Sequence, residues 1–196
     1  MNVTRIDRDS LLGLETYART RAEFRARIIP HRRLRTVHLG EHVTLQFEDE
    51  QTLRYQIQEM LRIERIFEEQ GIRDEIEVYG ALLPDGANWK ATMLIEYTEV
   101  EERRRELARL VDIEDRVWVC VAGHARVFAI ADEDLARETG EKTSAVHFLR
   151  FELTPDMRRA ALAGTPLSMG VDHPHYRAET LLDDAARTAL LADLKP

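Results

Sequence analysis

The apolar and polar positions of the chain form their most regular pattern between residues 51 and 70, QTLRYQIQEMLRIERIFEEQ. On a projection of about 100° per residue, one broad arc collects the apolar side chains Leu53, Ile57, Met60, Leu61, Ile63 and Phe67. This spacing predicts a long amphipathic helix at the centre of the fold. The polar side chains expected to face solvent are Arg54, Gln58, Arg62 and Arg65.

Glu64 projects to the middle of that apolar arc, and Gln56 also falls inside it. A carboxylate on a buried face is costly to desolvate unless it is paired with a cation, hydrogen-bonded, protonated or bound to a metal. Three interpretations therefore stay open. Glu64 reaches solvent where the helix is uncovered, or it forms a structural ion pair with an arginine, or it is a functional carboxylate.

The N-terminal part of the chain predicts two short helices. Asp9 or Ser10 is a suitable N-cap for a helix that runs to about residue 19. A second helix is expected over residues 21–29. It should stop there because a residue that precedes proline, here Pro30, disfavours helical backbone.

Alternation of apolar and polar residues predicts a β-hairpin at residues 35–39 and 42–48. Gly71 is expected to end the long helix, and residues 72–90 to form a loop-rich connection. The later patterns predict strands at residues 91–97, 116–122, 125–131 and 143–153 and helices at residues 99–111, 155–163 and 183–194.

About six strands in mostly hairpin order, with helices outside them, indicate an α+β fold with a mainly antiparallel sheet. The long central helix and several shorter helices are expected to pack on this sheet. A chain of 196 residues, 44% of them hydrophobic, is long enough for one sizeable core. No stretch resembles a linker, so a single domain over residues 1–196 is predicted.

The sequence contains no apolar run of membrane-spanning length, and residues 1–10 contain no signal-peptide core. We therefore expect a cytoplasmic protein without a membrane partner. Cys120 is the sole cysteine, so an intramolecular disulfide is excluded. Its setting in VWVCVAG predicts an unreactive thiol in a buried strand.

The charge distribution argues against a general nucleic-acid-binding protein, because the net charge is −8 and phosphate contacts need a positive field. One segment departs from this average. Residues 19–35 hold the seven arginines Arg19, Arg21, Arg25, Arg27, Arg32, Arg33 and Arg35 and one acidic residue, Glu23. Such a segment docks on carboxylates of the same chain or of a partner, or it binds an anion.

The motif DHPHYR at residues 172–177 concentrates the most reactive side chains, and Pro166, Gly170 and Pro174 predict a loop around it. In an extended stretch His173 and His175 point to the same side, where two imidazoles can hold one metal ion. The metal ligands expected here are His173, His175 and Asp172, and the ligand-binding residues expected are Asp172, His173, Tyr176 and Arg177. A polar surface loop without a ligand is the alternative.

Other histidines and one lysine supply further candidates. His38 and His42 are four residues apart in HLGEH, but the surrounding strands and glycine predict a hairpin turn instead of a zinc-binding helix. His147 shares one strand face with apolar residues, so it is a hydrogen-bonded core residue or a partner for Glu64. Arg150 is the other possible partner for Glu64. Lys90 is one of only three lysines and a candidate catalytic amine or a surface residue.

Four segments carry a resemblance to a known family: LPDGANWKATMLIEY, VEERRRELARLVDIEDRVWV, EKTSAVHFLRFEL and DHPHYR. They resemble a bacterial family known only as a domain of unknown function, family 3501, over nearly the whole chain. Genes of that family often lie beside genes for rubrerythrin-like proteins and iron–sulfur oxidoreductases. The resemblance therefore implies an accessory or interaction protein of a redox or peroxide-response pathway, with one of those proteins as its partner.

Two hypotheses follow for the function. The first is an accessory protein, monomeric or homodimeric, that binds a redox partner. The second is a metal-binding protein or small-molecule enzyme with an internal site built from Glu64, His147, Arg150 and the DHPHYR loop. The sequence contains no phosphate-binding glycine loop, nucleophile elbow or paired cysteines, so it specifies neither a cofactor nor an enzyme class.

Overall fold

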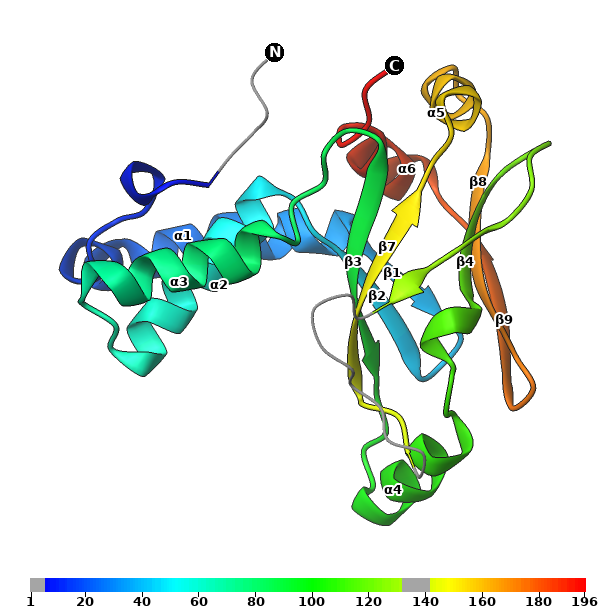
Figure 1. Cartoon of the computed structure of the whole chain (residues 1–196), viewed down its shortest axis with the longest axis horizontal. Helices are drawn as coiled ribbons and strands as arrows, with labels where there is room; N and C mark the ends of the chain where they lie inside the picture. Colours follow the sequence, from blue (N-terminus) through cyan, green and yellow to red (C-terminus); the bar gives the residue numbers. More distant parts are fainter. Residues whose placement is uncertain (1–5, 132–141) are drawn as a thin grey trace.

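The computed structural model describes residues 6–131 and 142–196, which form two antiparallel sheets and a group of helices (Figure 1). The first sheet has the order β1 (Thr36–Leu39), β2 (Val43–Phe47), β3 (Asn88–Ile95), β7 (Val146–Glu152) and β6 (Ile130–Ala131). The second has the order β5 (Val127–Phe128), β4 (Val117–Val121), β8 (Leu167–His173) and β9 (Tyr176–Leu181). The α+β class and the antiparallel pairing are confirmed.

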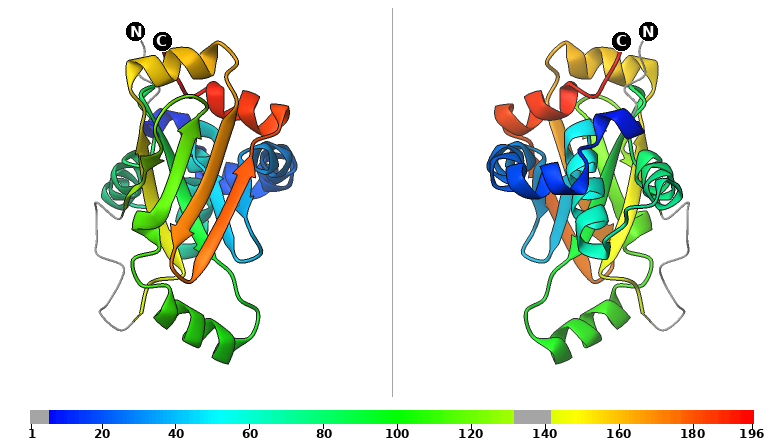
Figure 2. Two further views of the ribbon diagram at one scale, coloured as in Figure 1. Left: turned by 90° about the vertical axis from the view of Figure 1, so that its right-hand side faces the viewer. Right: turned by 90° about the vertical axis from the view of Figure 1, so that its left-hand side faces the viewer.

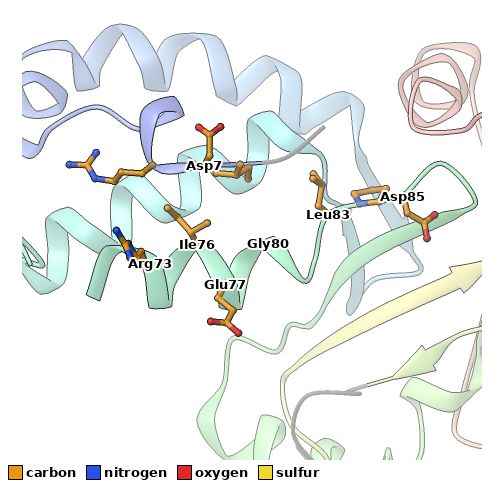
Figure 3. A pocket seen from close by; sticks show the side chains of 10 residues that line it. Asp7, Arg73, Ile76, Glu77, Gly80, Leu83 and Asp85 are labelled. Atoms are coloured by element: carbon orange, nitrogen blue, oxygen red, sulfur yellow. The ribbon is translucent and has the colours of Figure 1, made fainter. Parts of the chain in front are cut away.

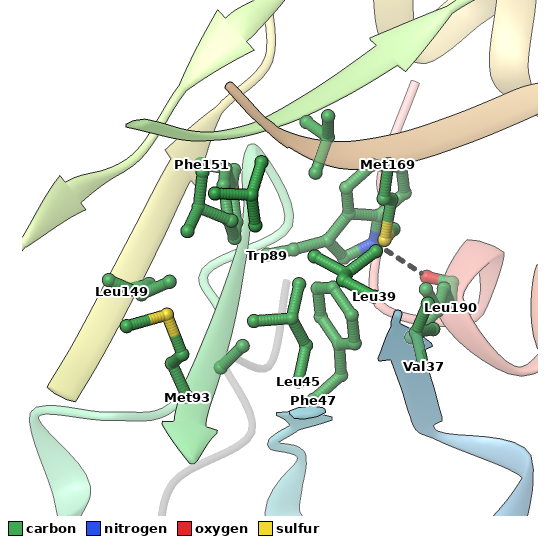
Figure 4. Packing of buried hydrophobic residues seen from close by; sticks show 14 of the residues in the cluster. Val37, Leu39, Leu45, Phe47, Trp89, Met93, Leu149, Phe151, Met169 and Leu190 are labelled. Carbon is green, nitrogen blue, oxygen red and sulfur yellow. Dashed lines mark hydrogen bonds between the residues drawn. The ribbon is translucent and has the colours of Figure 1, made fainter. Parts of the chain in front are cut away.

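The two sheets pack face to face around one apolar core, which forms the body of the molecule (Figures 1 and 4). In β2 the apolar half of the predicted alternation is confirmed, because Val43, Leu45 and Phe47 are buried, but Thr44 on the expected wet face is buried as well and donates its hydroxyl to Glu96. Trp89 lies in the centre of this core and donates its indole N–H to the carbonyl of Leu190, 2.9 Å away. The core therefore depends on inward-facing residues of both sheets and on the last helix.

The structure has more strands than the sequence predicts, and the reason lies in three segments. Residues 125–131 form two short strands, since Ala129 bonds to β4 while Ile130 pairs with β7 of the other sheet. Strands β8 and β9 lie where the sequence predicts a loop. The described residues thus hold nine strands in two sheets, where about six in one sheet are predicted.

Three helices and a short 3-10 helix project from one side of the body and form a helical arm (Figures 1 and 2). Its elements are η1 (Arg8–Ser10), α1 (Leu14–Leu34), α2 (Glu50–Glu64) and α3 (Glu69–Gly80). The arm has an apolar cluster of its own, made of Ile6, Leu11, Leu53, Ile57, Leu61 and Ile72. The helices of this arm are thus held by packing separate from the core of the body.

Helix α1 replaces the two short helices predicted before Pro30. It is a single helix of 21 residues that includes Pro30. Proline removes one backbone hydrogen bond from a helix and clashes with the preceding turn. The turn after Pro30 is anchored from outside the helix, since His31 Nε2 lies 2.6 Å from Asp49 Oδ2 and the Arg35 side chain is buried in the body. Those contacts hold the residues after Pro30 in place and explain why the helix continues past the proline.

Helix α2 ends at Glu64, so the long central helix predicted over residues 51–70 is not confirmed. Arg65 adopts a left-handed backbone conformation with φ of 54°, and the N–H of Ile66 closes the helix on Leu61. Gly71 does not end a helix but lies inside α3, where a Cβ would approach Cγ2 of Ile66 to 2.7 Å. The loop-rich connection predicted from residue 72 is therefore wrong in its first part.

The faces of α2 also differ from the projection. Gln58 is buried, because its side chain accepts a hydrogen bond from the N–H of Leu12 at 2.6 Å and donates to the Leu12 carbonyl at 3.2 Å. Ile63 and Glu64 are exposed, since the helix ends there and nothing covers them. Of the interpretations of Glu64, the one in which it reaches solvent describes the structure.

Three of the remaining helices lie close to their predicted positions: α4 (Val100–Arg109), α5 (Pro155–Leu162) and α6 (Asp184–Leu191). The short 3-10 helix η2 (Glu114–Arg116) was not predicted. The hydroxyl of Thr154 accepts a hydrogen bond from the N–H of Met157 and caps α5, as expected. Cys120 lies in β4 as predicted but is half-buried, because Val119 and Val121 take the inward positions. No helix among residues 6–131 and 142–196 has the length and apolarity needed to span a membrane.

Arg35 joins the arm to the body at the end of α1. Its buried guanidinium donates to the carbonyl oxygens of Phe47, Glu48 and Ala189 and pairs with Asp193. Burial raises the pKa of Asp193 to about 6, although Arg35 opposes this shift. One interpretation of the arginine-rich segment is that its arginines bind carboxylates of the same chain. Arg35 fits this interpretation.

Candidate functional site

The DHPHYR motif forms a β-hairpin instead of the predicted loop. Strands β8 and β9 are joined by a two-residue turn, with Asp172 opposite Arg177 and His173 opposite Tyr176. The glycine that suggests a loop, Gly170, is required for packing, since a Cβ there would lie 2.4 Å from the Trp118 ring. The hairpin therefore presents alternate residues to opposite sides of the second sheet.

Both ring nitrogens of His173 have partners in the protein. Nε2 lies 3.0 Å from the carbonyl of Val111, and Nδ1 accepts the N–H of His175 at 3.2 Å, which places the proton on Nε2. Burial lowers the pKa of His173. Asp172 points to the opposite side of the strand, and no three His, Cys, Asp or Glu side chains in the described ranges are arranged to hold a metal ion. A metal bound by His173, His175 and Asp172 stays a prediction.

Tyr176 connects the hairpin to the turn between β1 and β2. Its hydroxyl donates to the carbonyl of Leu39 at 2.6 Å and accepts from the N–H of His42 at 3.0 Å. Gly40 leaves room for this contact, since a Cβ there would lie 2.6 Å from the hydroxyl oxygen. The ligand-binding role predicted for Tyr176 stays untested, and its hydroxyl is used to hold the two sheets together.

The residues proposed for one internal site lie in separate parts of the molecule. Glu64 is on α2, at the opposite side of the molecule from β9 (Figure 1). His147 faces the core, with Nε2 2.8 Å from Thr143 Oγ1 and 3.7 Å from Glu114 Oε2. Its contacts are those of a hydrogen-bonded core histidine.

Lys90 and Arg150 are neighbours on β3 and β7. The ammonium group of Lys90 donates to the carbonyl of Ala81, and Arg150 pairs with Glu152. Neither contact involves Glu64 or the DHPHYR hairpin. The structure therefore brings Lys90 and Arg150 together but does not assemble the predicted composite site.

The arm carries a cluster of carboxylates on α2 and α3. Burial raises the pKa of Glu75, and the negative charges of Glu64 and Asp74 raise it further. Gln70 donates a hydrogen bond to Asp74, but no lysine or arginine in the described part of the chain pairs with Glu64 or Glu75. These carboxylates therefore repel one another and favour an approaching cation.

The same two helices and their connection expose large apolar side chains. Ile63, Phe67 and Val78 are 60%, 67% and 63% exposed, and they are three of the five most exposed large hydrophobic residues in the described ranges. Single exposed apolar residues are common on protein surfaces, but a concentration on one projecting element is typical of a binding surface. We name the carboxylates Glu64, Asp74 and Glu75 together with Ile63, Phe67 and Val78 the arm face.

A groove runs along another side of α3 (Figure 3). It encloses about 760 Å³ between α3, the segment at Asp7 and the chain at Leu83. Ile76 and Leu83 contribute apolar surface, and Arg73 and Glu77 stand on α3 beside them. The arm thus offers both an exposed face and a groove to a second molecule.

Comparison with known proteins places the chain in a family. The family model for a protein of unknown function, DUF3501, matches residues 5–194. The chain belongs to the DUF3501 family. A crystal structure of a protein of unknown function from Burkholderia pseudomallei is 54% identical to this DUF3501 chain, covers 98% of it and 100% of its own length, and superposes with a TM-score of 0.93. No curated protein matches.

Sequence reasoning missed most of the candidate surface of this DUF3501 protein. Ile72, Ile76 and Tyr79 have the spacing of a helix that buries one side, but the prediction of a helix end at Gly71 and a loop-rich connection after it hides this pattern. The signal was therefore present as apolar periodicity and was obscured by Gly71. The comparisons indicate no biochemical function, so the function has to be argued from the geometry.

Proposed function

We propose that this DUF3501 protein is an accessory protein that binds another protein through its helical arm. The observation that supports this function is the arm face, where Ile63, Phe67 and Val78 are exposed on the elements that carry unpaired carboxylates. Burying one such side chain contributes roughly 1.5–3 kcal/mol, so three of them supply a useful part of a binding free energy.

The negative charges on the arm face indicate which residue types a partner should present. Glu64 and Asp74 both raise the pKa of Glu75, so a lysine or arginine of a partner would relieve repulsion that is already present in the free protein. A complementary surface therefore combines apolar side chains with basic ones. A second copy of this chain is one competitor for this position, because the exposed arginines of α1 carry the required charge.

The family resemblance implies which partner to test. We propose a rubrerythrin-like protein or an iron–sulfur oxidoreductase encoded near the gene, within a redox or peroxide-response pathway of the cytoplasm. In this proposal the chain acts as a single domain. The composite small-molecule site of Glu64, His147, Arg150 and the DHPHYR hairpin stays an alternative without support from the observed distances.

The test is a binding measurement with the full-length chain and each purified candidate partner. Phe67→Asp should abolish binding, because it removes the largest apolar side chain of the arm face and replaces it with a carboxylate that is costly to desolvate against apolar surface. Leu181→Asp is the matched control, since Leu181 is 69% exposed on β9, away from the arm. Equal loss in both variants, or no binding by the unaltered chain to either candidate, would overturn the proposed partner.

The oligomeric state of the free chain distinguishes between a different protein and a second copy of this chain as the occupant of the arm face. Light scattering should report a monomer at micromolar concentration for the unaltered chain and for Phe67→Asp. A dimer that Phe67→Asp dissociates would show that a second copy occupies the arm face, and the proposed heterologous partner would be rejected.

A further inference from the structure

A second cleft lies on the outer side of the first sheet and is lined by residues of β1, β2, β3 and α4. Figure 1 shows where these elements lie in the body. The cleft encloses about 800 Å³. Among the residues that line it are His38, His42, Thr44, Glu96, Tyr97 and Glu102. A cleft of this size matches small-molecule sites in other proteins, and none of the residues proposed for the arm contributes to it.

A chain of hydrogen bonds connects His38 to a carboxylate in this cleft. Strand register places His38 opposite Thr44, whose hydroxyl donates to Glu96 Oε2 at 2.7 Å. His38 Nδ1 lies 3.1 Å from the same hydroxyl oxygen. Since the hydroxyl proton is used on Glu96, the hydroxyl accepts from His38 and the proton of the neutral ring is on Nδ1. Nε2 of the exposed His38 ring is therefore an acceptor.

His42 is held in the same tautomer by different contacts. Its Nδ1 lies 2.9 Å from the carbonyl of Glu96, so Nδ1 donates, and in the neutral ring Nε2, 4.0 Å from Glu41 Oε2, is the acceptor. The ring stacks on Tyr97 with centroids 4.0 Å apart and an interplanar angle of 19°. Burial raises the pKa of Tyr97 to about 12, and Glu106 adds to the shift, so the phenol is neutral beside His42 at pH 7.

The polar groups of the cleft are mostly acceptors. Two imidazole nitrogens and the carboxylates of Glu41, Glu96 and Glu102 stand against one lining cation, Arg103. Such a wall favours a ligand that brings N–H donors and positive charge. A metal ion is the less suitable ligand, because no group of three metal-binding side chains occurs in the described ranges.

We infer that this cleft binds a small organic amine, with His38 Nε2 accepting one of its N–H groups and the carboxylates balancing its charge. The hydrogen bond from His38 through Thr44 to Glu96 fixes the tautomer that presents this acceptor. The site is independent of the arm, so its failure and the failure of the proposed partner are separate results.

The probe is putrescine, a diamine, and the neutral control is 1,4-butanediol of the same length. Histidine ring resonances of the full-length chain should shift saturably with putrescine at His38 and His42 and stay unchanged at the exposed His175. Shifts of equal size with butanediol, equal shifts at His175, or no shifts at all would overturn the inference.

Two variants test the role of the hydrogen-bond chain. His38→Ala removes the acceptor of an exposed residue and should weaken putrescine binding about fivefold to tenfold, while His175→Ala should leave it unchanged. Thr44→Val should change the nitrogen shifts of His38 in the free protein, because its tautomer loses its partner. Unchanged binding in His38→Ala would contradict the assignment.

Discussion

The body and the arm of this molecule are stabilised by different physical means. Among the described residues, the core of the body contains 26 buried apolar residues from its sheets and the segments packed on them, whereas the cluster of the arm contains six. The arm adds buried polar contacts to that cluster. Gln58 bonds to both backbone groups of Leu12, and Glu59 accepts hydrogen bonds from Arg21 and Tyr17.

This difference has a consequence for stability. Burial of apolar area depends weakly on pH and salt, whereas ion pairs depend on both. Glu59 Oε1 and Oε2 each lie 2.7 Å from the Arg21 guanidinium, and that contact lowers the pKa of Glu59 to about 2. The arm should therefore respond to acid under conditions that leave the body folded.

The largest expected effect is in the body. Trp89→Ala removes the largest side chain from the core and leaves the carbonyl of Leu190 without its donor. The free energy of unfolding should fall by roughly 3–5 kcal/mol. Urea denaturation followed by circular dichroism measures the loss. A loss below about 1 kcal/mol would show that the body is not held by the packing described.

A smaller effect is expected for the ion pair of the arm. Glu59→Gln should lower the free energy of unfolding by about 1.5 kcal/mol at pH 7, the low end of the range for charged hydrogen bonds, since Arg21 is a third exposed. The folded-state pKa of Glu59 is about 2 against an ordinary 4.5. Its contribution is therefore complete above pH 4.5 and is lost as pH falls toward 2.

Hydrogen exchange localises that effect. Amides of α1 and α2 in the unaltered chain should lose protection between pH 4.5 and pH 2, whereas amides of β3 and β7 should keep it. Glu59→Gln should flatten the pH dependence in the arm. Parallel loss in arm and body would mean that the two regions unfold as one unit, and the contrast drawn above would fail.

The smallest effect is expected on the arm face. Phe67→Asp should change the free energy of unfolding by less than about 0.5 kcal/mol, because Phe67 is 67% exposed. Thermal unfolding measures this directly. A large destabilisation would reveal that Phe67 supports the arm, and the loss of partner binding in that variant would no longer indicate a contact surface.

The sequence predicts those helices and strands that are specified by residues within the same segment. The apolar residues Val43, Leu45 and Phe47 of β2 are buried as expected, and Thr154 caps α5 as expected. Pro30, Gly71 and Gly170 misled the prediction for a common reason. Each was interpreted as a break, and each is accommodated by contacts with residues that are distant or on another element, which no local window contains.

The candidate sites were harder to predict because they depend on pairing across the chain. His38 reaches Glu96 only because β1 pairs with β2 and β2 with β3, which joins positions 58 residues apart. The helical pattern places Glu64 on the apolar arc, but the left-handed conformation of Arg65 ends the helix and leaves Glu64 exposed, which the pattern does not reveal.

The contacts of Arg35 also bear on how the chain folds during synthesis. Ala189 and Asp193 accept hydrogen bonds from the Arg35 guanidinium, and both are synthesised more than 150 residues after Arg35. A buried guanidinium without its partners is strongly unfavourable. The ribosome must therefore synthesise and release α6 before the root of the arm can close on the body, although α1 is made much earlier.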